Sequence, residues 1–326
     1  MILIALLACT DKGGDTDTDT TSPDDTQVDG PVWELVGEEL DGGVLIGAWS
    51  SGDELLMVGG WLYDGPGTLM RFDGTSLCHE QIADHALWWI HGASADDYYA
   101  VGESGTILHF SGGAWTDESP KSDATFYGVW DEGDTTWAVG GNPASGLGEI
   151  WKRSGGTWEL AKGDIEGTVF KVWNGWFVGA NVGFRLEGDT LVEDAPGFHA
   201  LTVRGGDGVA WTVGGTQTSE IMSNDGGGWT EVDTSGLGQP LMGVWTDDGE
   251  DVWVSGAFGT SAWLDETGWS FPDLPLTSNA LHAVWKHGDG MWFVGGNLST
   301  ASGDYHGTIV RYGEALGEVD VSACGG

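Results

Sequence analysis

The side chains best suited to acid–base or metal chemistry in this chain are eight histidines and 51 acidic residues. No two histidines have the spacing of a zinc enzyme, such as His-Glu-x-x-His. The sequence also contains no Gly-x-Ser-x-Gly turn, phosphate-binding loop or Cys-His nucleophile. The carboxylates are numerous, but abundance alone does not place two of them across a glycosidic bond. The sequence therefore predicts no catalytic residue, no cofactor and no metal, and favours a protein that is not an enzyme.

The cationic side chains follow a repeat. Of the five arginines, Arg71, Arg185 and Arg311 occupy the same position of a recurring strand, which His109 and Lys152 occupy in other copies. A position that recurs with a structural repeat is better explained by the repeat than by convergence on one substrate.

The charge balance limits the possible partners. The formal net charge is −40, from 51 acidic and 11 basic residues. Nucleic acids and anionic lipid headgroups are bound through a basic surface, which this composition does not supply, so neither is expected as a partner. A cation, a basic protein or a neutral glycan remain candidates, and solubility is the simplest reason for the charge.

The first residues resemble the lipobox of bacterial lipoproteins. Residues 1–8 are nearly all apolar, and they end in Leu6-Leu7-Ala8 before Cys9. The resemblance implies a signal peptide over residues 1–9 and a lipid on Cys9. No Lys or Arg precedes the apolar stretch, so the alternative is an apolar chain end with a chance cysteine. The stretch is shorter than the about 20 apolar residues of a membrane-spanning helix.

Residues 10–30 contain almost nothing that could enter a core, and they are expected to form a disordered acidic tether. We predict a protein held by lipid at the outer membrane or cell surface, or else periplasmic or secreted, which meets the membrane only through that anchor. Cys78 and Cys324 are candidates for a disulfide, because two thiols in an oxidising compartment often pair. They lie far apart in the sequence, so only a fold that brings them together could join them.

Two motifs recur about every 39 residues, as the positions of their last residues show. One resembles Trp-Ala-Val-Gly and ends at Gly59, Gly102, Gly140, Gly179, Gly214, Gly256 and Gly295. The other resembles Leu-x-Gly-Val-Trp and ends at Trp49, His91, Trp130, Trp173, Arg204, Trp245 and Trp285. We interpret His91, which replaces a tryptophan there, as structural. Two further strand-like segments follow in each unit, so a unit consists of four short strands separated by Gly- and Asp-rich turns.

Four strands per unit are the content of one propeller blade, which must stack on its neighbours to bury both faces. We predict an all-β, single seven-bladed β-propeller of four-stranded blades over residues 31–326. The protein is expected to be a monomer. Trp33 precedes Trp49 by 16 residues, as outer-strand Trp229 precedes inner-strand Trp245. Residues 32–36 are therefore expected to close the last blade as an N-terminal outer strand, which removes an open edge.

Most tryptophans are explained by the repeat. Fifteen of the 20 fall in its inner, second or outer strands, which indicates packing rather than a carbohydrate platform. The exceptions are Trp61, Trp88, Trp89, Trp151 and Trp263.

Three connections between second and third strands are expected to be enlarged: residues 59–68, 140–149 and 295–308. The first and last belong to blades one and seven, which are neighbours in a closed ring. Their aromatic and polar side chains suit a sugar or a peptide, although ordinary loop variation is the alternative. The candidate ligand-binding residues are Trp61, Tyr63, Asp64, Asp304, Tyr305 and His306. For the acidic turns at the opposite ends of the blades, exposure to solvent is a simpler interpretation than cation binding.

The units resemble tandem propeller repeats of secreted bacterial lipoproteins, photosystem II stability/assembly factor-type propellers, and BNR/Asp-box repeats. Residues 223–229 are similar to the Asp-box pattern Ser-x-Asp-x-Gly-x-Thr-Trp, one residue short. An Asp-box stabilises a turn, so the resemblance implies fold rather than chemistry. Asp-box sialidases use three converging arginines, which the repeated positions of Arg71, Arg185 and Arg311 do not favour. The favoured function is non-enzymatic binding of an envelope protein or glycan. The alternatives are a glycan-binding or glycan-hydrolysing propeller and an assembly factor for a membrane complex.

Overall fold

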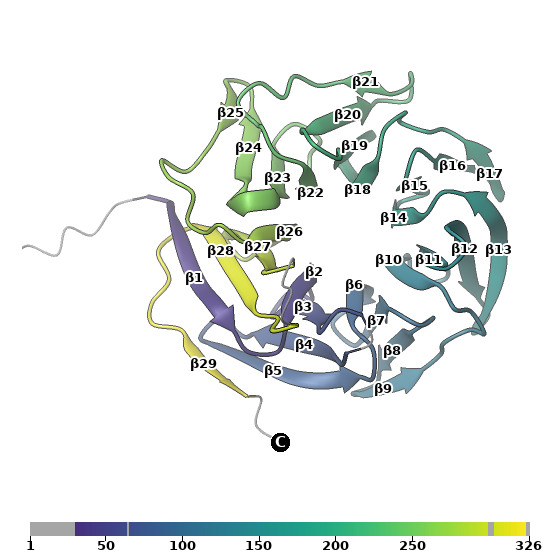
Figure 1. Cartoon of the computed structure of the whole chain (residues 1–326), viewed down its shortest axis with the longest axis horizontal. Coiled ribbons are helices and arrows are strands. Elements are labelled where there is room, and N and C mark those ends of the chain that lie inside the picture. The colour runs from purple at the N-terminus through teal and green to yellow at the C-terminus, as the bar shows by residue number, and fades with distance from the viewer. Residues whose placement is uncertain (1–29, 64, 299–302, 324–326) are drawn as a thin grey trace, which may run out of the picture. The chain divides into compact units, whose positions relative to one another are not determined.

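The computed structural model describes residues 30–63, 65–298 and 303–323. Pro31–Gly326 form one compact unit, in which the described strands build seven sheets arranged in a ring (Figure 1). The prediction of an all-β, seven-bladed propeller is confirmed. Among the described residues, no helix is long and apolar enough to cross a membrane.

The blades follow one another along the chain. Blade one contains β2 (Val44–Ser50), β3 (Leu55–Gly60), β4 (Gly67–Phe72), β5 (Ser76–Ala83) and β29 (Asp320–Ala323). Blade two contains β6 (Leu87–Ser94), β7 (Asp97–Gly102), β8 (Ile107–Ser111) and β9 (Ala114–Asp117). Blade three contains β10 (Thr125–Asp131), β11 (Thr136–Gly141), β12 (Leu147–Ser154) and β13 (Thr157–Glu166). Blade four contains β14 (Val169–Trp173), β15 (Trp176–Gly179), β16 (Gly183–Glu187) and β17 (Thr190–Glu193).

Blade five contains β18 (Ala200–Gly206), β19 (Val209–Gly214), β20 (Glu220–Asn224) and β21 (Thr230–Glu231). Blade six contains β22 (Leu241–Trp245), β23 (Val252–Gly256), β24 (Ser261–Asp265) and β25 (Gly268–Ser270), with the 3₁₀ turn η1 (Ala257–Gly259) between β23 and β24. Blade seven contains β26 (Ala280–His287), β27 (Gly290–Gly296), β28 (Gly307–Gly313) and β1 (Val32–Leu40). In each blade the first of these strands lies nearest the axis (Figure 1).

The N-terminal strand β1 is the outer strand of blade seven. It pairs antiparallel with β28, where Trp33 lies opposite Tyr312, and it runs to Leu40, beyond the predicted residues 32–36. The Trp33 ring lies 5.0 Å from the Tyr312 ring and 6.0 Å from the Trp263 ring of blade six, measured between centroids. The first strand therefore packs against the last two blades as well as pairing with one of them.

The C-terminal strand β29 adds a fifth strand to blade one, which the sequence did not predict. It pairs parallel with β5, and Ser322 lies opposite Cys78. Cys78 is disulfide-bonded. Cys324 lies outside the described residues, so the pairing of these two cysteines stays a prediction.

Every inner strand contains a β-bulge at the same position. The register with the second strand shifts between Leu45 and Gly47 in blade one and between Phe126 and Gly128 in blade three, and correspondingly in the other five blades. In the Leu-x-Gly-Val-Trp motif the unpaired residue is therefore x. In blade three the following residue is Gly128, where the blades approach closely: a Cβ on it would lie 2.9 Å from the Phe170 carbonyl oxygen.

The hairpin of blade four is shorter than the others, as the spacing from Trp173 to Gly179 predicts. Trp173 pairs directly with Trp176, so only two residues make the turn. Both have positive φ, 43° at Asn174 and 78° at Gly175, which is the requirement of a two-residue hairpin turn.

Candidate functional site

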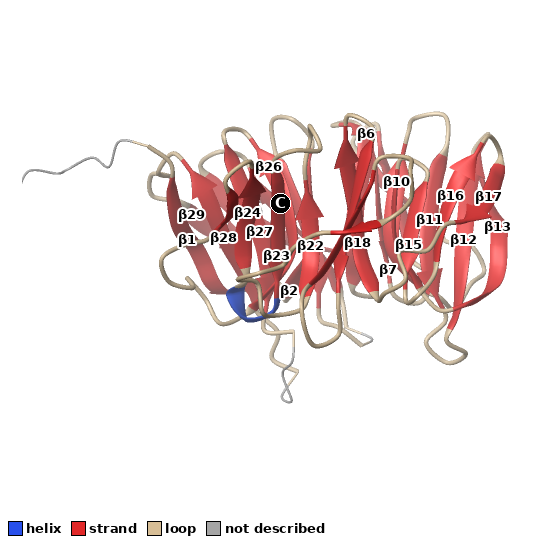
Figure 2. Ribbon diagram, turned by 90° about the horizontal axis from the view of Figure 1, so that it is seen from above, coloured by secondary structure: helices blue, strands red, loops and turns tan. Residues whose placement is uncertain are grey.

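The connections between second and third strands lie on one face of the ring, which we call the loop face. Blade seven uses residues 297–306 for this connection and blade one residues 61–66, against 180–182 in blade four. Blade three, with residues 142–146, is no longer here than blade five, with 215–219, so its predicted enlargement is wrong. The turn η1 projects at the same end of the strands, at the lower edge of Figure 2.

The bulge residues of the inner strands surround the axis at the loop face. A hollow of about 250 Å³ opens there, lined by Trp88, Tyr127, Phe170, Lys171, Leu201 and His282. Five of these six are the unpaired residues of their bulges, in blades two, three, four, five and seven. A bulge re-aims a side chain, and in these five blades it turns one residue toward the axis. We call this hollow the channel mouth.

Aromatic rings form the wall of the channel mouth edge to face. Between ring centroids, Trp88 lies 4.8 Å from Tyr127, and Tyr127 lies 5.3 Å from Phe170. Trp88 also lies 5.9 Å from His282 of blade seven. The Nδ1 atom of His282 is 2.7 Å from the Ile46 carbonyl oxygen of blade one, which fixes the ring between the blades. Edge-to-face packing of this kind is favourable, so the wall is preformed.

Lys171 follows the bulge residue of blade four and lies at the base of the channel mouth, where only 3% of the residue is exposed. Its ammonium nitrogen is 4.0 Å from the centroid of the Trp89 ring and donates a hydrogen bond to the Tyr127 carbonyl oxygen. Burial lowers the pKa of Lys171 to about 7, because an apolar surrounding disfavours the charged form.

Below Lys171 the axis is filled by side chains. His91 stacks on Trp130 at 4.0 Å between centroids, and the Arg204 guanidinium lies 4.5 Å from the Trp285 ring. Only about 10 Å³ of space remains among the residues at this depth. Burial, followed by the neighbouring Arg204 charge, lowers the pKa of His91, which agrees with its interpretation as a structural histidine. The channel mouth is therefore a blind pocket.

The structure brings three of the predicted ligand residues to the edge of the channel mouth. Trp61 and Tyr305 pack in one cluster with Trp88. The Tyr63 backbone N–H donates to Glu103 Oε1 at 3.1 Å, and the same oxygen is 3.5 Å from Trp88 Nε1. Trp61, Tyr63 and Tyr305 thus lie beside the channel mouth.

Tyr63 and Tyr305 differ in how much of each residue is exposed to solvent, and this difference indicates different roles. Tyr63 is 78% exposed, whereas Tyr305 is 7% exposed and packs on Val44 and Leu62. Burial, then Tyr63 and Glu103, raise the pKa of Tyr305. Tyr305 therefore supports the rim from beneath, and Tyr63 is the aromatic side chain that a ligand could reach.

Two further predicted ligand residues, Asp304 and His306, flank Tyr305 at the end of the blade-seven connection. His306 Nε2 is 3.3 Å from Asp304 Oδ1, and the His306 backbone N–H donates to Asn297 Oδ1 at 2.7 Å. These contacts hold the end of the connection within blade seven. Asp64 lies outside the described residues, as do Cys9 and the segment 1–29.

The three repeated arginines form their ion pairs within their own blades, whereas Lys152 of blade three pairs with Asp189 of blade four. Arg71 pairs with Glu54 and Glu80 at 3.4 and 3.3 Å. Arg311 pairs with Glu34 at 3.2 Å and with Asp289 at 2.8 Å. Arg185 pairs with Glu187 and, at 3.5 Å, with Asp194. These three arginines do not converge, which agrees with the interpretation of their position as a feature of the repeat.

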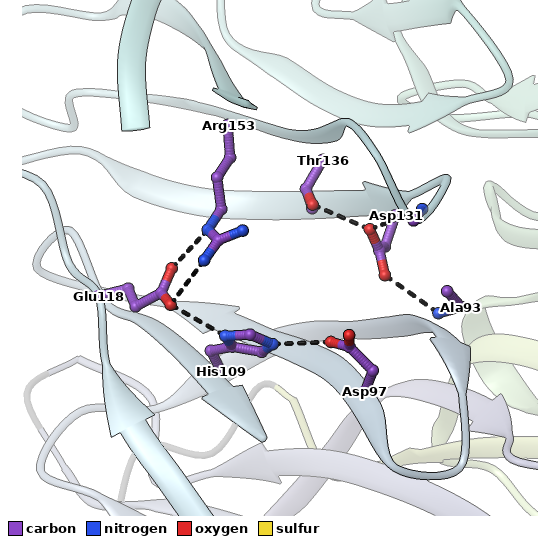
Figure 3. A network of polar contacts seen from close by, with 8 residues as sticks. Ala93, Asp97, His109, Glu118, Asp131, Thr136 and Arg153 are labelled. Atoms are coloured by element: carbon purple, nitrogen blue, oxygen red, sulfur yellow. Dashed lines mark hydrogen bonds and ion pairs between the residues drawn. The ribbon is translucent and has the colours of Figure 1, made fainter. Parts of the chain in front are cut away.

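A polar network joins blades two and three (Figure 3). His109 contacts Asp97 through Nε2 at 2.7 Å and Glu118 through Nδ1 at 2.9 Å. Glu118 also accepts two hydrogen bonds from the Arg153 guanidinium, at 2.7 and 3.0 Å. The buried Asp131 accepts hydrogen bonds from the Ala93 N–H at 3.1 Å and from the Thr136 hydroxyl at 2.9 Å. All these acceptors and donors are used between strands, so the network is structural.

Sequence reasoning missed Tyr127, Phe170, Lys171 and His282 as surface-forming residues. A signal was present, because Trp88 is one of the five tryptophans that the repeat does not explain. A larger hollow of about 600 Å³ lies between blades one and two and is lined by polar side chains such as Gln81, Asp84 and Ser119. Among the described residues, no cluster of His, Cys, Asp and Glu could hold a metal ion.

Comparison with known proteins shows the fold. No family model matches the chain, and no curated protein does. Solved structures do. YCF48 bound to a D1 peptide is 14% identical, with a TM-score of 0.63 over 86% of this chain and 96% of that one. YCF48 from Cyanidioschyzon merolae is also 14% identical, with a TM-score of 0.61 over 86% and 98%.

A second kind of neighbour comes from larger proteins. The extracellular domain of the one-component system protein BT4673 from B. thetaiotaomicron is 12% identical, with a TM-score of 0.59 over 85% of this chain and 39% of that one. The chain is therefore similar in fold to YCF48 and to the extracellular domain of BT4673, and it is a seven-bladed β-propeller.

Proposed function

We propose that this protein is a non-enzymatic binding propeller of the cell envelope, which takes a protein partner on its loop face. The observation that carries the proposal is the exposed Tyr63, which Glu103 links to Trp88 in the aromatic wall of the channel mouth. Exposed aromatic rings beside a preformed apolar hollow are typical of interaction sites, because they bury large area at low entropic cost.

The fold neighbours support a protein partner. YCF48 is seen with a D1 peptide, so a propeller of this fold binds a polypeptide segment. The network around His109 and the separated arginines use their polar groups between strands, which leaves the loop face as the better candidate.

The envelope location rests on the N-terminal sequence. Leu6-Leu7-Ala8-Cys9 resembles a lipobox, and an acidic segment follows it. Cys9→Ser should release the protein from membranes into the soluble fraction, measured by fractionation and immunoblotting. Membrane retention of the variant equal to that of the parent would contradict the lipid anchor.

The binding face is tested with surface variants of the full chain. Tyr63→Asn removes the exposed ring and keeps a residue that tolerates the φ of 65° found there. Retention of partners from detergent-solubilised envelope should fall at least tenfold in this variant. Asp134→Asn, in a turn at the other end of the blades, is the matched control and should retain them fully. Equal retention by both variants would place the binding face elsewhere.

A glycan is the other class of ligand that exposed aromatic rings could serve. A glycan array distinguishes the two classes. Specific glycan binding that depends on Tyr63, with no retained protein, would favour the glycan-binding alternative over the present proposal.

A further inference from the structure

The channel mouth contains a buried cation without a carboxylate partner among the described residues. Lys171 has a backbone carbonyl and the Trp89 ring as its contacts, and no described Asp or Glu lies within 4.0 Å of its ammonium nitrogen. Lys152 and Lys286, by contrast, each pair with an aspartate. Lys171 differs from those two lysines because it is buried, with 3% of the residue exposed, at the base of a hollow that a ligand could enter.

The groups that face Lys171 are also unsuited to neutralise it. They are Tyr127 on β10, His282 on β26 and, deeper in the channel, Arg204 on β18 and His91 on β6. The Lys171 charge, after burial, helps to lower the pKa of His282 to about 3. Glu103 stands at the rim, where it holds the Tyr63 backbone. The base of the hollow therefore has positive or neutral groups and apolar walls.

We propose that the channel mouth binds a carboxylate attached to an apolar body. The carboxylate pairs with the Lys171 ammonium, and the body lies against Trp88, Tyr127 and Phe170. This inference deepens the proposed function, because it uses the same face and names the chemistry that the axis recognises.

The size of the hollow fits this ligand class. An apolar cavity of about 150 Å³ is enough to hold benzene. The channel mouth, with about 250 Å³, therefore has room for an aromatic or branched aliphatic group together with its carboxylate. Two sources supply such a group: a small free acid, and the C-terminal residue of a polypeptide.

The pairing makes binding depend on pH. The pKa of Lys171 is about 7 without ligand, so the charged fraction falls as the pH rises through that value. A carboxylate favours the charged form and raises that pKa. Binding near neutral pH should therefore take up protons, and affinity should fall, by up to about tenfold per pH unit, above the pKa of the free protein.

The experiment measures the binding of matched pairs of probes to the full chain by ligand-observed NMR. Phenylacetate is compared with phenylacetamide, and the tripeptide Gly-Gly-Phe as free acid is compared with its amide. Lys171→Met removes the charge while keeping an unbranched apolar side chain, which a buried position tolerates. Lys152→Met, on the neighbouring blade, is the control.

We expect at least one acid to bind about 10- to 100-fold more tightly than its amide, the range of a hydrogen bond to a charged group. Lys171→Met should remove that preference, Lys152→Met should keep it, and it should weaken between pH 7 and pH 9. A preference for phenylacetate alone identifies a small acid, and a preference for the free-acid tripeptide identifies a chain end. Equal binding of acids and amides, or a preference that survives in Lys171→Met, overturns the inference.

The outcomes are distinguishable from those for the proposed function. If neither acid binds while Tyr63→Asn still abolishes partner retention, the ligand chemistry is wrong and the binding face stands. If an acid binds through Lys171 but partner retention is the same with and without Tyr63, the proposed binding face is contradicted and the proposed pocket is supported.

Discussion

Glu118 shows how single residues join neighbouring blades. Its carboxylate accepts hydrogen bonds from Arg153 of blade three and contacts His109 of blade two (Figure 3). Burial raises its pKa, but the hydrogen bonds from Arg153 and His109 outweigh burial, so the pKa of Glu118 is lowered overall. A lowered folded-state pKa means that the ionised carboxylate stabilises the fold.

The stability that Glu118 supplies is therefore present above its unfolded-state pKa and is lost as the pH falls through the folded-state value. Glu118→Gln should reduce the free energy of unfolding at pH 7, and the difference from the parent should shrink below about pH 4.5. Urea unfolding at pH 7 and pH 4 measures this. Glu193→Gln, an exposed residue of β17, is the control. A difference that stays constant with pH would contradict the role assigned to the carboxylate.

Single residues also show the limit of sequence reasoning. The position x of the Leu-x-Gly-Val-Trp motif looks free, since it holds Ile46, Trp88, Tyr127 and Phe170 in successive blades. The sequence cannot show that x is unpaired in a bulge, because a bulge is a difference in register between two strands. Lys171 was missed for the same reason, since its burial depends on where the bulge places the inner strand.

At the scale of elements, β1 holds the ring closed through pairing and packing. Trp33 contacts Tyr312 in its own blade and Trp263 in blade six. Truncating a large aromatic side chain in such a cluster costs about 3–5 kcal/mol when it is fully buried. Because Trp33 is half-buried, Trp33→Ala should lower the free energy of unfolding by about 2–3 kcal/mol.

Leu35→Ala is the control for this prediction. Leu35 belongs to the same strand but is 40% exposed, so its truncation should cost less than about 1 kcal/mol. Denaturant unfolding of both variants provides the comparison. Equal losses would mean that β1 contributes through its backbone pairing alone.

The pairing of β29 with β5 bears on the predicted disulfide between Cys78 and Cys324. Ser322 pairs with Cys78, so the chain returns to blade one just before Cys324 in the sequence. If these cysteines pair, the bridge closes a span of 324 − 78 = 246 residues, worth at most about 5 kcal/mol in the chain-entropy model. Cys324→Ser should lower the thermal midpoint, and reducing agent should then have no further effect.

Peptide mapping without reduction identifies the bond directly. A fragment that links Cys78 to Cys324 is the expected result. A fragment that links Cys78 to Cys9 would contradict both the pairing and the lipid anchor.

At the scale of the whole molecule, the charge of −40 opposes the compact state. Folding concentrates like charges, and salt screens them over about 10 Å at 0.1 M. The unfolding midpoint should therefore rise between 20 mM and 500 mM NaCl. Sucrose at equal osmolality is the control for effects other than screening. A midpoint that falls with NaCl would mean that favourable ion pairs, such as Arg311 with Glu34, outweigh the general repulsion.

The fold could be predicted because the same strand pattern recurs in seven units of the sequence, whereas each feature of the surface occurs only once. The period near 39 residues and the spacing from Trp33 to Trp49 place the blades and the N-terminal strand. The strand β29 was not predictable, because Asp320–Ala323 has no counterpart in another blade. Enlarged loops can be seen in a sequence, but the burial of Tyr305 within its loop depends on packing across two blades.

The central claim is that partners bind on the loop face, and photo-crosslinking in intact cells tests it most directly. Tyr63→p-benzoylphenylalanine places a reactive ring on that face, and Asp134→p-benzoylphenylalanine places the same ring at the other end of the blades. The account predicts a discrete crosslinked product from position 63 and none from position 134. A product from position 134 with none from position 63 would contradict it.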